Sequence, residues 1–377
     1  YNSMGISVIP YEKDERGYDQ LYEVLKNWNS EINKTSTYLY SSFQEIQEAL
    51  NNFDEAEATR VLQLIKNDKP QEEYFFSELS ATSTPFPWLK ILKEKGYFDP
   101  SKNPPPEEDT NQKGYFRIPY WNVLGYLENV AIQNKEKPST EITNLLLEII
   151  DSIIDYQNDK GERIDNYITD STIIKIAFSL PIKSISQKHV EFLRTALRSK
   201  WDTMLIAAEI SKTVFPKLIE GQDIELVLKL LEIIFDYKKE NNSRGSKYTS
   251  IMDEYWLDKS LKKYKPAIAE LCGIETAKIA THKIKSLSQE NTQTFNTILI
   301  PTIEDHPQTR FSDRYECILV QFVRDILQFS QPGVIKTLVS SLIREPYPIL
   351  RRIGTVSYTH LRAHETSLHL VCRLLLE

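Results

Sequence analysis

The sequence LLEIIDSIIDY at Leu146–Tyr156 returns in shortened form as LLEIIFDY at Leu230–Tyr237. In both copies the apolar residues recur at the three- and four-residue spacing of an amphipathic helix. The copies start at positions 146 and 230, which corresponds to two units of about 42 residues, near the period of HEAT-type helix pairs. We therefore expect a run of stacked helical hairpins.

The same helical spacing continues through most of the chain, and strand-like alternation is confined to Ile6–Tyr11. Asp54 followed by Glu57 is an N-cap pattern that opens a helix to Ile65. The predicted helical stripes are Leu21–Trp28, Phe43–Leu50, Tyr120–Ala131, Ile142–Tyr156, Ile173–Leu180, Val190–Leu197, Leu205–Leu218, Ile224–Tyr237, Ile251–Leu271, Ala277–Leu287, Tyr315–Phe329 and Val334–Ile343. Helices that each carry one apolar stripe must pack on neighbours, so the sequence predicts an all-α fold stacked as a HEAT-like α-solenoid.

A proline-rich segment interrupts the helices at Asp99–Pro119. It contains Pro104–Pro106, whose prolines remove backbone donors and favour an extended conformation. We predict a helical N-terminal lobe over 1–98, an irregular strap over 99–119 and a helical-repeat array over 120–355.

Composition excludes several classes of protein. The chain has 377 residues and a net charge of −7, and no apolar run reaches the about 20 residues that cross a bilayer. Its glycines form neither a P-loop nor a dinucleotide-binding fingerprint. Cys272, Cys317 and Cys372 lack metal-ligand spacing, which fits a reducing compartment. We expect a cytoplasmic region without membrane contact, cofactor, metal or catalytic residues.

The tail at 356–377 reads VSYTHLRAHETSLHLVCRLLLE and resembles the conceptual translation of a transposase-type sequencing adapter. Every fixed codon of that adapter matches, and the free positions fall where its variable index belongs. Four tail residues otherwise look like metal ligands: His360, His364, His369 and Cys372. We expect them to form no site, and we expect both ends of the chain to be artificial.

Two polar groups in the array raise the question of catalysis. Glu162, Asp165 and Asp170 gather near Arg163, and a hydrolase can use such carboxylates. No metal-ligand spacing or strand scaffold accompanies them, so we expect a solvated turn between helices. His189 falls in the first turn of a predicted helix, where we expect an exposed or partly packed histidine.

Basic and aromatic residues interleave between Lys238 and Lys285. The candidate interaction residues are Lys238, Lys239, Arg244, Lys247, Lys259, Lys262, Lys263, Tyr255 and Trp256. Such a mixture can grip a nucleic acid or an acidic partner. The alternative is that the lysines solvate a helix face while Tyr255 and Trp256 pack inward.

Aromatic residues also gather around the proline-rich segment. They form a candidate structural or docking corner with Trp88, Tyr97, Phe98, Pro105, Tyr120 and Trp121. The rings either pack under the proline-rich strap or present a docking surface to another domain of the same protein.

The pattern Trp88-Leu89, Gly96–Phe98 and Pro119–Trp121, together with Arg344–Ile353, resembles long bacterial multidomain proteins. In those proteins a helical region follows an effector or a NACHT/STAND-type NTPase, and roles in antiphage defence are suspected. The resemblance covers about residues 70–354. It implies a helical region that senses a partner and relays binding to an upstream NTPase, and it transfers no catalytic residue.

We therefore expect a non-catalytic scaffold or sensor region whose partners are proteins or other domains of the same polypeptide. The alternative is the accessory helical part of an enzyme, such as a nuclease, that holds nucleic acid through the basic residues of 238–285.

Overall fold

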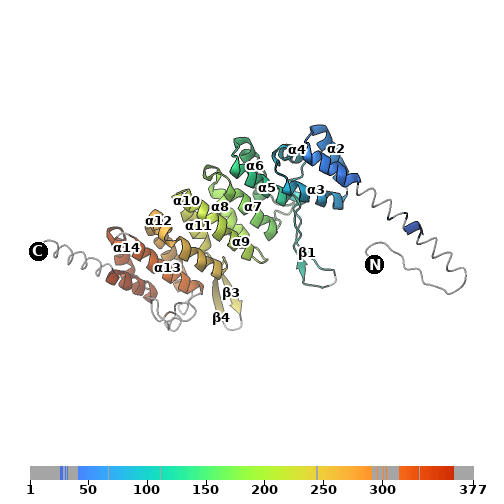
Figure 1. Cartoon of the computed structure of the whole chain (residues 1–377). Helices are drawn as coiled ribbons and strands as arrows, with labels where there is room; N and C mark the ends of the chain where they lie inside the picture. The colour runs from blue at the N-terminus through green and yellow to red at the C-terminus, as the bar shows by residue number, and fades with distance from the viewer. Residues whose placement is uncertain are drawn as a thin grey trace, which may run out of the picture. The chain divides into compact units, whose positions relative to one another are not determined.

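The computed structural model describes residues 26–28, 30, 32, 41–66, 68–110, 112–242, 245–290, 295, 300, 303, 314–330 and 332–360, most of which are helical (Figure 1). The chain forms two compact units, Tyr1–Ile91 and Leu92–Glu377. The predicted strand Ile6–Tyr11 lies outside the described residues.

The first unit contains a helix over 41–51, α2 (Glu55–Ile65), α3 (Lys69–Ala81) and the start of α4 (Phe86–Glu94). The predicted cap is confirmed, because the Asp54 side chain accepts the backbone N–H groups of Ala56 and Glu57. The core of this unit is aromatic: Trp88 is 1% exposed, and its ring meets that of Phe75 edge to face at 5.1 Å.

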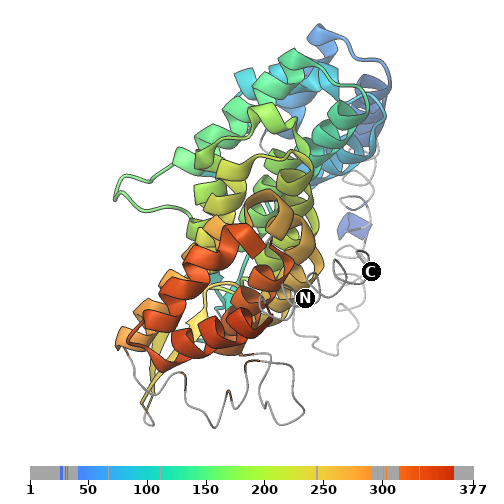
Figure 2. The same cartoon turned by 90° about the vertical axis from the view of Figure 1, so that its left-hand side faces the viewer.

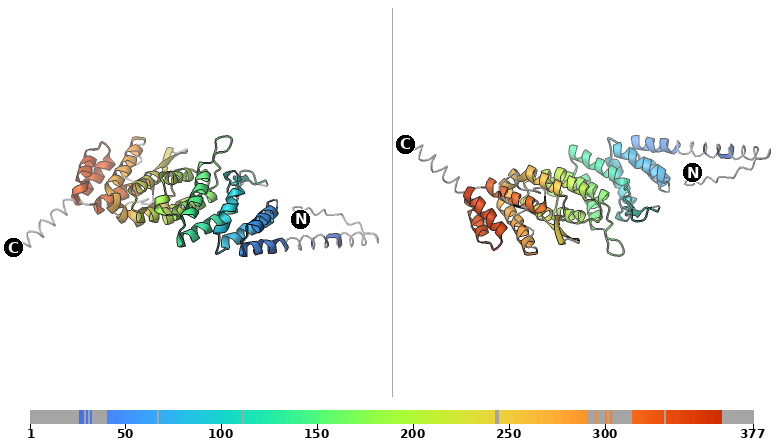
Figure 3. Two further views of the ribbon diagram at one scale, coloured as in Figure 1. Left: turned by 90° about the horizontal axis from the view of Figure 1, so that it is seen from above. Right: turned by 90° about the horizontal axis from the view of Figure 1, so that it is seen from below.

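The second unit is a succession of helices that pack on one another (Figures 2 and 3). They are η2 (Pro100–Lys102), α5 (Val123–Glu136), α6 (Thr140–Asp155), α7 (Tyr167–Ser179), η3 (Ile182–Ser184), α8 (Gln187–Leu197), α9 (Met204–Glu209), the π-helical turn η4 (Ile210–Val214), α10 (Phe215–Glu220), α11 (Ile224–Ile234), α12 (Glu254–Glu290), α13 (Tyr315–Phe329), α14 (Pro332–Arg344) and a helix over 348–360. Helix α5 packs on α7, α7 on α9, α8 on α11, α11 on α12 and α12 on α13.

The repeated pentapeptide lies in α6 and α11. In each helix the first leucine and both isoleucines of the repeat are buried. Side chains cap both helices, since Ser139 accepts the N–H of Ile142 and Asp223 accepts that of Leu226. The repeat thus encodes two helices that each bury one apolar face.

Two antiparallel strand pairs depart from the purely helical prediction. Strands β1 (Glu107–Glu108) and β2 (Phe116–Arg117) pair within the proline-rich segment. Strands β3 (Tyr237–Asn242) and β4 (Gly245–Ser250) form a hairpin. The predicted helix Ile224–Tyr237 is therefore too long and ends at Ile234. The physical reason is that Tyr237 pairs across the hairpin and its ring packs on that of Tyr248, with centroids 5.7 Å apart.

Helix α12 joins two helices that the sequence predicted separately. The backbone breaks at Cys272, where φ is −154° and ψ is 34°. The next residue, Gly273, allows close approach to α13, because a Cβ there would lie 2.6 Å from Ser330 Oγ. The predicted helices Ile251–Leu271 and Ala277–Leu287 therefore follow each other directly, joined at the break without a loop.

Candidate interaction surfaces

Two rings and a lysine at the start of α12, together with a lysine of η4, form what we call the α12 aromatic patch: Tyr255, Trp256, Lys259 and Lys212. Tyr255 is 62% exposed and meets Trp256 edge to face, with ring centroids 5.4 Å apart. The Lys259 ammonium lies 5.3 Å from the Tyr255 centroid and 4.7 Å from that of Trp256. The Lys212 ammonium lies 5.3 Å from the Trp256 centroid. Exposed rings beside ammonium groups offer cation–π and stacking contacts to a partner. The expectation that Tyr255 packs inward is wrong.

The other predicted basic residues do not join this patch as one surface. Lys238 and Lys239 are exposed on β3, Lys247 lies on β4, and Arg244 lies outside the described residues. On α12, Lys262 forms an ion pair of 2.7 Å with Asp258. Lys263 lies over the Tyr264 ring at 4.8 Å. The structure therefore divides the eight predicted residues that it describes between a hairpin and a helix.

Lys212, which the sequence analysis missed, comes from the π-helical turn η4. Pro216 follows one turn later and has no N–H to offer the carbonyl of Lys212, which favours a widened turn. Tyr264 supports the turn from α12 by donating its hydroxyl to the Ser211 carbonyl at 3.3 Å and stacking on Phe215 with ring centroids 5.1 Å apart. The signal in the sequence was a proline inside a helical stripe.

Ser186, His189 and Asp151 stand in the order of a catalytic triad. His189 Nε2 lies 3.2 Å from Asp151 Oδ1, and Nδ1 lies 3.2 Å from Ser186 Oγ. However, Nδ1 accepts the Ser186 backbone N–H at 2.9 Å, so its lone pair is engaged and cannot take the hydroxyl proton. The arrangement is the capping box of α8, and it stabilises the helix start.

This capping box makes the stability of the fold depend on pH. Burial lowers the pKa of His189 below its usual value, and Asp151 opposes the shift only in part. Stability from the neutral ring is present above the unfolded pKa of about 6.5 and is lost as pH falls through the lower folded pKa. We expect the urea midpoint to fall between about pH 7.5 and pH 5, and to fall less in His189→Gln. Equal falls in both proteins would refute the assignment.

Of the carboxylates near Arg163, Asp170 forms a buried ion pair, so the expectation of a solvated turn is wrong for that residue, whereas Glu162 is exposed. Asp170 is 1% exposed, and Arg163 donates to both of its oxygens at 2.6 and 2.7 Å. The Arg163 guanidinium also lies 5.6 Å from the Phe192 ring centroid. Asp165 accepts the Lys200 backbone N–H at 3.1 Å. These contacts tie the segment before α7 to α7 and to α8.

The aromatic corner is distributed over both units. Trp88 belongs to the core of the first unit. In the second unit Phe98 and Trp121 are buried, and Phe98 stacks on Tyr126 with centroids 6.2 Å apart. Lys102 lies 5.2 Å from the Tyr97 centroid. The remaining corner residues, Pro105 and Tyr120, are exposed.

Asn166 ties the proline-rich strap to α7. Its Nδ2 donates to the carbonyls of Pro104 and Pro119, each at 2.9 Å, and its Oδ1 accepts the N–H groups of Ile168 and Thr169. Asn166 itself is 0% exposed. One side chain therefore caps a helix and holds both sides of the strap.

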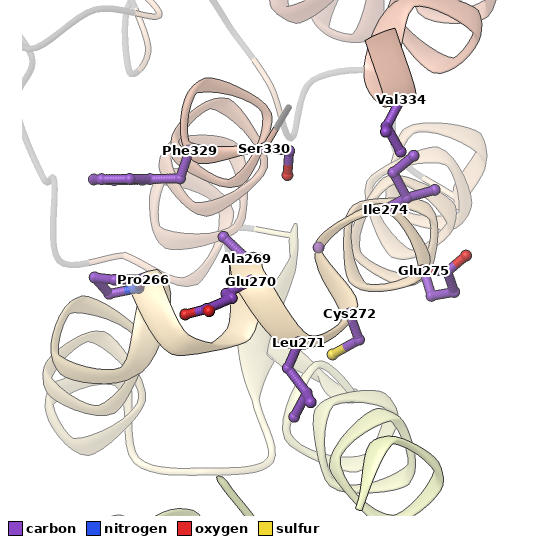
Figure 4. A pocket seen from close by; sticks show the side chains of 11 residues that line it. Pro266, Ala269, Glu270, Leu271, Cys272, Ile274, Glu275, Phe329, Ser330 and Val334 are labelled. Carbon is purple, nitrogen blue, oxygen red and sulfur yellow. The ribbon is translucent and has the colours of Figure 1, made fainter. Parts of the chain in front are cut away.

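A recess opens at the break of α12 (Figure 4). Its volume is about 500 Å³, and its lining includes Glu270 before the break, Glu275 after it and Phe329 at the end of α13. Burial raises the pKa of the Cys272 thiol, whose sulfur lies 3.3 Å from Thr276 Oγ1. A buried thiol with a raised pKa is a poor nucleophile at neutral pH.

Across the described part of the chain, no group of His, Cys, Asp or Glu side chains has the geometry to hold a metal ion. None of the helices described is both long and apolar enough to cross a membrane. His360 ends the described part of the tail, whereas His364, His369 and Cys372 lie beyond it. Comparison with protein-family models, curated proteins and solved structures gives no match.

Proposed function

We propose that the chain is a non-catalytic helical scaffold or sensor region of a larger bacterial protein of the cytoplasm, stacked as a HEAT-like α-solenoid. Its role in this proposal is to bind a protein partner or another domain of the same polypeptide. The observation that carries the proposal is a series of ion pairs that links successive helices along the second unit.

This ion-pair row runs along the second unit. Its links are Lys93–Glu148 (α4 to α6), Lys188–Asp155 (α6 to α8), Lys229–Glu191 and Arg194–Asp236 (α8 to α11 and its C-terminal end), Asp236–Lys283 (to α12) and Lys285–Glu345 (to the end of α14). A second row contains Lys175–Glu128 between α5 and α7, and Lys265–Asp325 between α12 and α13. These ion pairs join helices that belong to successive helical hairpins, which supports serial stacking. Proteins built this way present long surfaces to partners.

The contiguous genomic reading frame tests this proposal most directly. An upstream P-loop NTPase module supports a sensor that relays binding, in line with the resemblance to NACHT/STAND-type proteins. An upstream hydrolase fold supports an accessory role in an enzyme. A gene that ends near Thr355 with no upstream domain contradicts both.

The α12 aromatic patch favours a second candidate function, which is to hold single-stranded nucleic acid. Its rings provide stacking platforms and its lysines contact phosphates. In that case oligothymidylate binding would weaken steeply from about 50 to about 200 mM salt. Trp256→Ala would weaken it further, whereas Lys336→Glu on α14 would not. Under the scaffold proposal we expect no salt-dependent binding of the oligonucleotide, and Trp256→Ala to change nothing.

A further inference from the structure

A groove runs along the surface between α11 and the second half of α12, and we call it the α11–α12 groove. Its volume is about 630 Å³, within the range of about 300 to 1,000 Å³ that is typical of ligand sites. Leu228 of α11 and Ile279 of α12 are half-buried and give it apolar surface. The groove is therefore large enough to take side chains of a bound segment.

The α12 side of this groove is basic. Lys278 and His282 are exposed and lie one helical turn apart, so they share a face of α12. Neither side chain has an ion-pair partner among the residues that the structure describes. The two are free to contact a bound anion.

A cluster of charged side chains lies behind this wall. Asp236, which is 7% exposed, pairs with Arg194, Arg198 and Lys283, and Arg194 also pairs with Glu191 and Glu232. Burial lowers the pKa of Lys283, the charges of Arg194 and Arg198 lower it further, and that of Glu232 opposes the shift. These cations are therefore already paired, which leaves Lys278 and His282 as the groups that face a bound anion.

The α11 side carries both signs of charge. Glu225, Lys229 and Glu232 line the groove from α11. Glu225 accepts a hydrogen bond from Gln187, and Glu232 pairs with Lys229. The two glutamates repel a continuous phosphate backbone, and the carboxylate oxygens that remain can accept hydrogen bonds from amide groups. A nucleic acid therefore fits poorly, whereas a peptide can present carboxylates to α12, amides to α11 and an apolar side chain to Leu228 and Ile279.

We propose that the α11–α12 groove binds an acidic peptide segment of a protein partner, with carboxylates against Lys278 and His282. This inference rests on the proposed role in protein binding and names the site and the partner chemistry.

The test uses the full chain and a fluorescein-labelled peptide of alternating glutamate and leucine, followed by fluorescence anisotropy. We expect Lys278→Glu to weaken binding about tenfold or more, because it removes an attraction and adds a repulsion. Lys336→Glu makes the same charge change at an exposed site on α14 and is expected to leave binding unchanged. Circular dichroism of both variants checks that the helices are intact.

Two outcomes overturn the groove assignment. One is equal affinity of Lys278→Glu and Lys336→Glu for the peptide. The other is tighter binding of oligothymidylate or inorganic polyphosphate than of the peptide, which would assign the groove to phosphate. Equal affinity of the two variants leaves the scaffold proposal standing, because the upstream reading frame tests that proposal independently.

Discussion

Replacement of Asn166 by aspartate is expected to lower the free energy of unfolding by about 3 to 5 kcal/mol. The new side chain keeps the oxygen that caps α7 but loses both N–H donors. The carbonyls of Pro104 and Pro119, each 2.9 Å from Nδ2, are then left facing a carboxylate oxygen. Because Asn166 is 0% exposed, water cannot replace the lost hydrogen bonds without opening the strap.

Asn158 provides the matched control. Its Oδ1 accepts the backbone N–H groups of Lys160 and Glu162 at 2.9 and 3.0 Å. Aspartate preserves both contacts, so Asn158→Asp is expected to change the free energy of unfolding by less than about 0.5 kcal/mol. Urea unfolding followed by circular dichroism measures both variants. If the two substitutions lower the free energy of unfolding equally, Asn166 does not hold the strap.

The caps and the apolar faces of the helices could be predicted from sequence because they are local. Asp54 caps a helix through N–H groups two and three residues away. The hydrogen bonds of Asn166 to the strap span 47 and 62 residues. Nothing in the residues around position 166 indicates which distant carbonyls the amide meets. The sequence therefore predicts that the strap is irregular but not what holds it.

In the candidate surfaces, too, local features could be predicted from the sequence and long-range contacts could not. The aromatic–lysine composition pointed to Tyr255, Trp256 and Lys259, which do share one patch. Lys212 joins them only because a π-helical turn folds against α12. The basic residues of β3 belong to a hairpin, since a tyrosine pair overrides the helical periodicity that precedes it. Contacts between elements, and not residue type, decide which charges face a partner.

Replacement of Arg163 by methionine is expected to lower the free energy of unfolding about as much as Asn166→Asp does. Burial alone would lower the pKa of Arg163, but the hydrogen bonds and charge of Asp170 raise it overall. Burial raises the pKa of Asp170, although Arg163 opposes that effect. In Arg163→Met a carboxylate that is 1% exposed loses its bidentate partner. We expect a loss of about 3 to 5 kcal/mol at neutral pH.

The pH dependence of the loss distinguishes an unpaired buried charge on Asp170 from a simple packing defect. An acid whose pKa is raised in the folded state contributes stability below its unfolded pKa, about 3.9 for aspartate, and that stability is lost as pH rises. Without Arg163 the pKa of Asp170 rises further, so the cost of Arg163→Met should shrink towards about pH 4 and grow towards about pH 8.

Two comparisons complete the test. Arg163→Met combined with Asp170→Asn removes the buried charge, so we expect it to recover most of the loss and to show little of this pH dependence. Arg60→Met breaks an exposed pair with Glu45, in which the arginine side chain is 68% exposed. Its expected cost is below about 0.5 kcal/mol. If Arg163→Met costs the same at every pH, lost packing against Phe192 explains the defect and the buried charge does not.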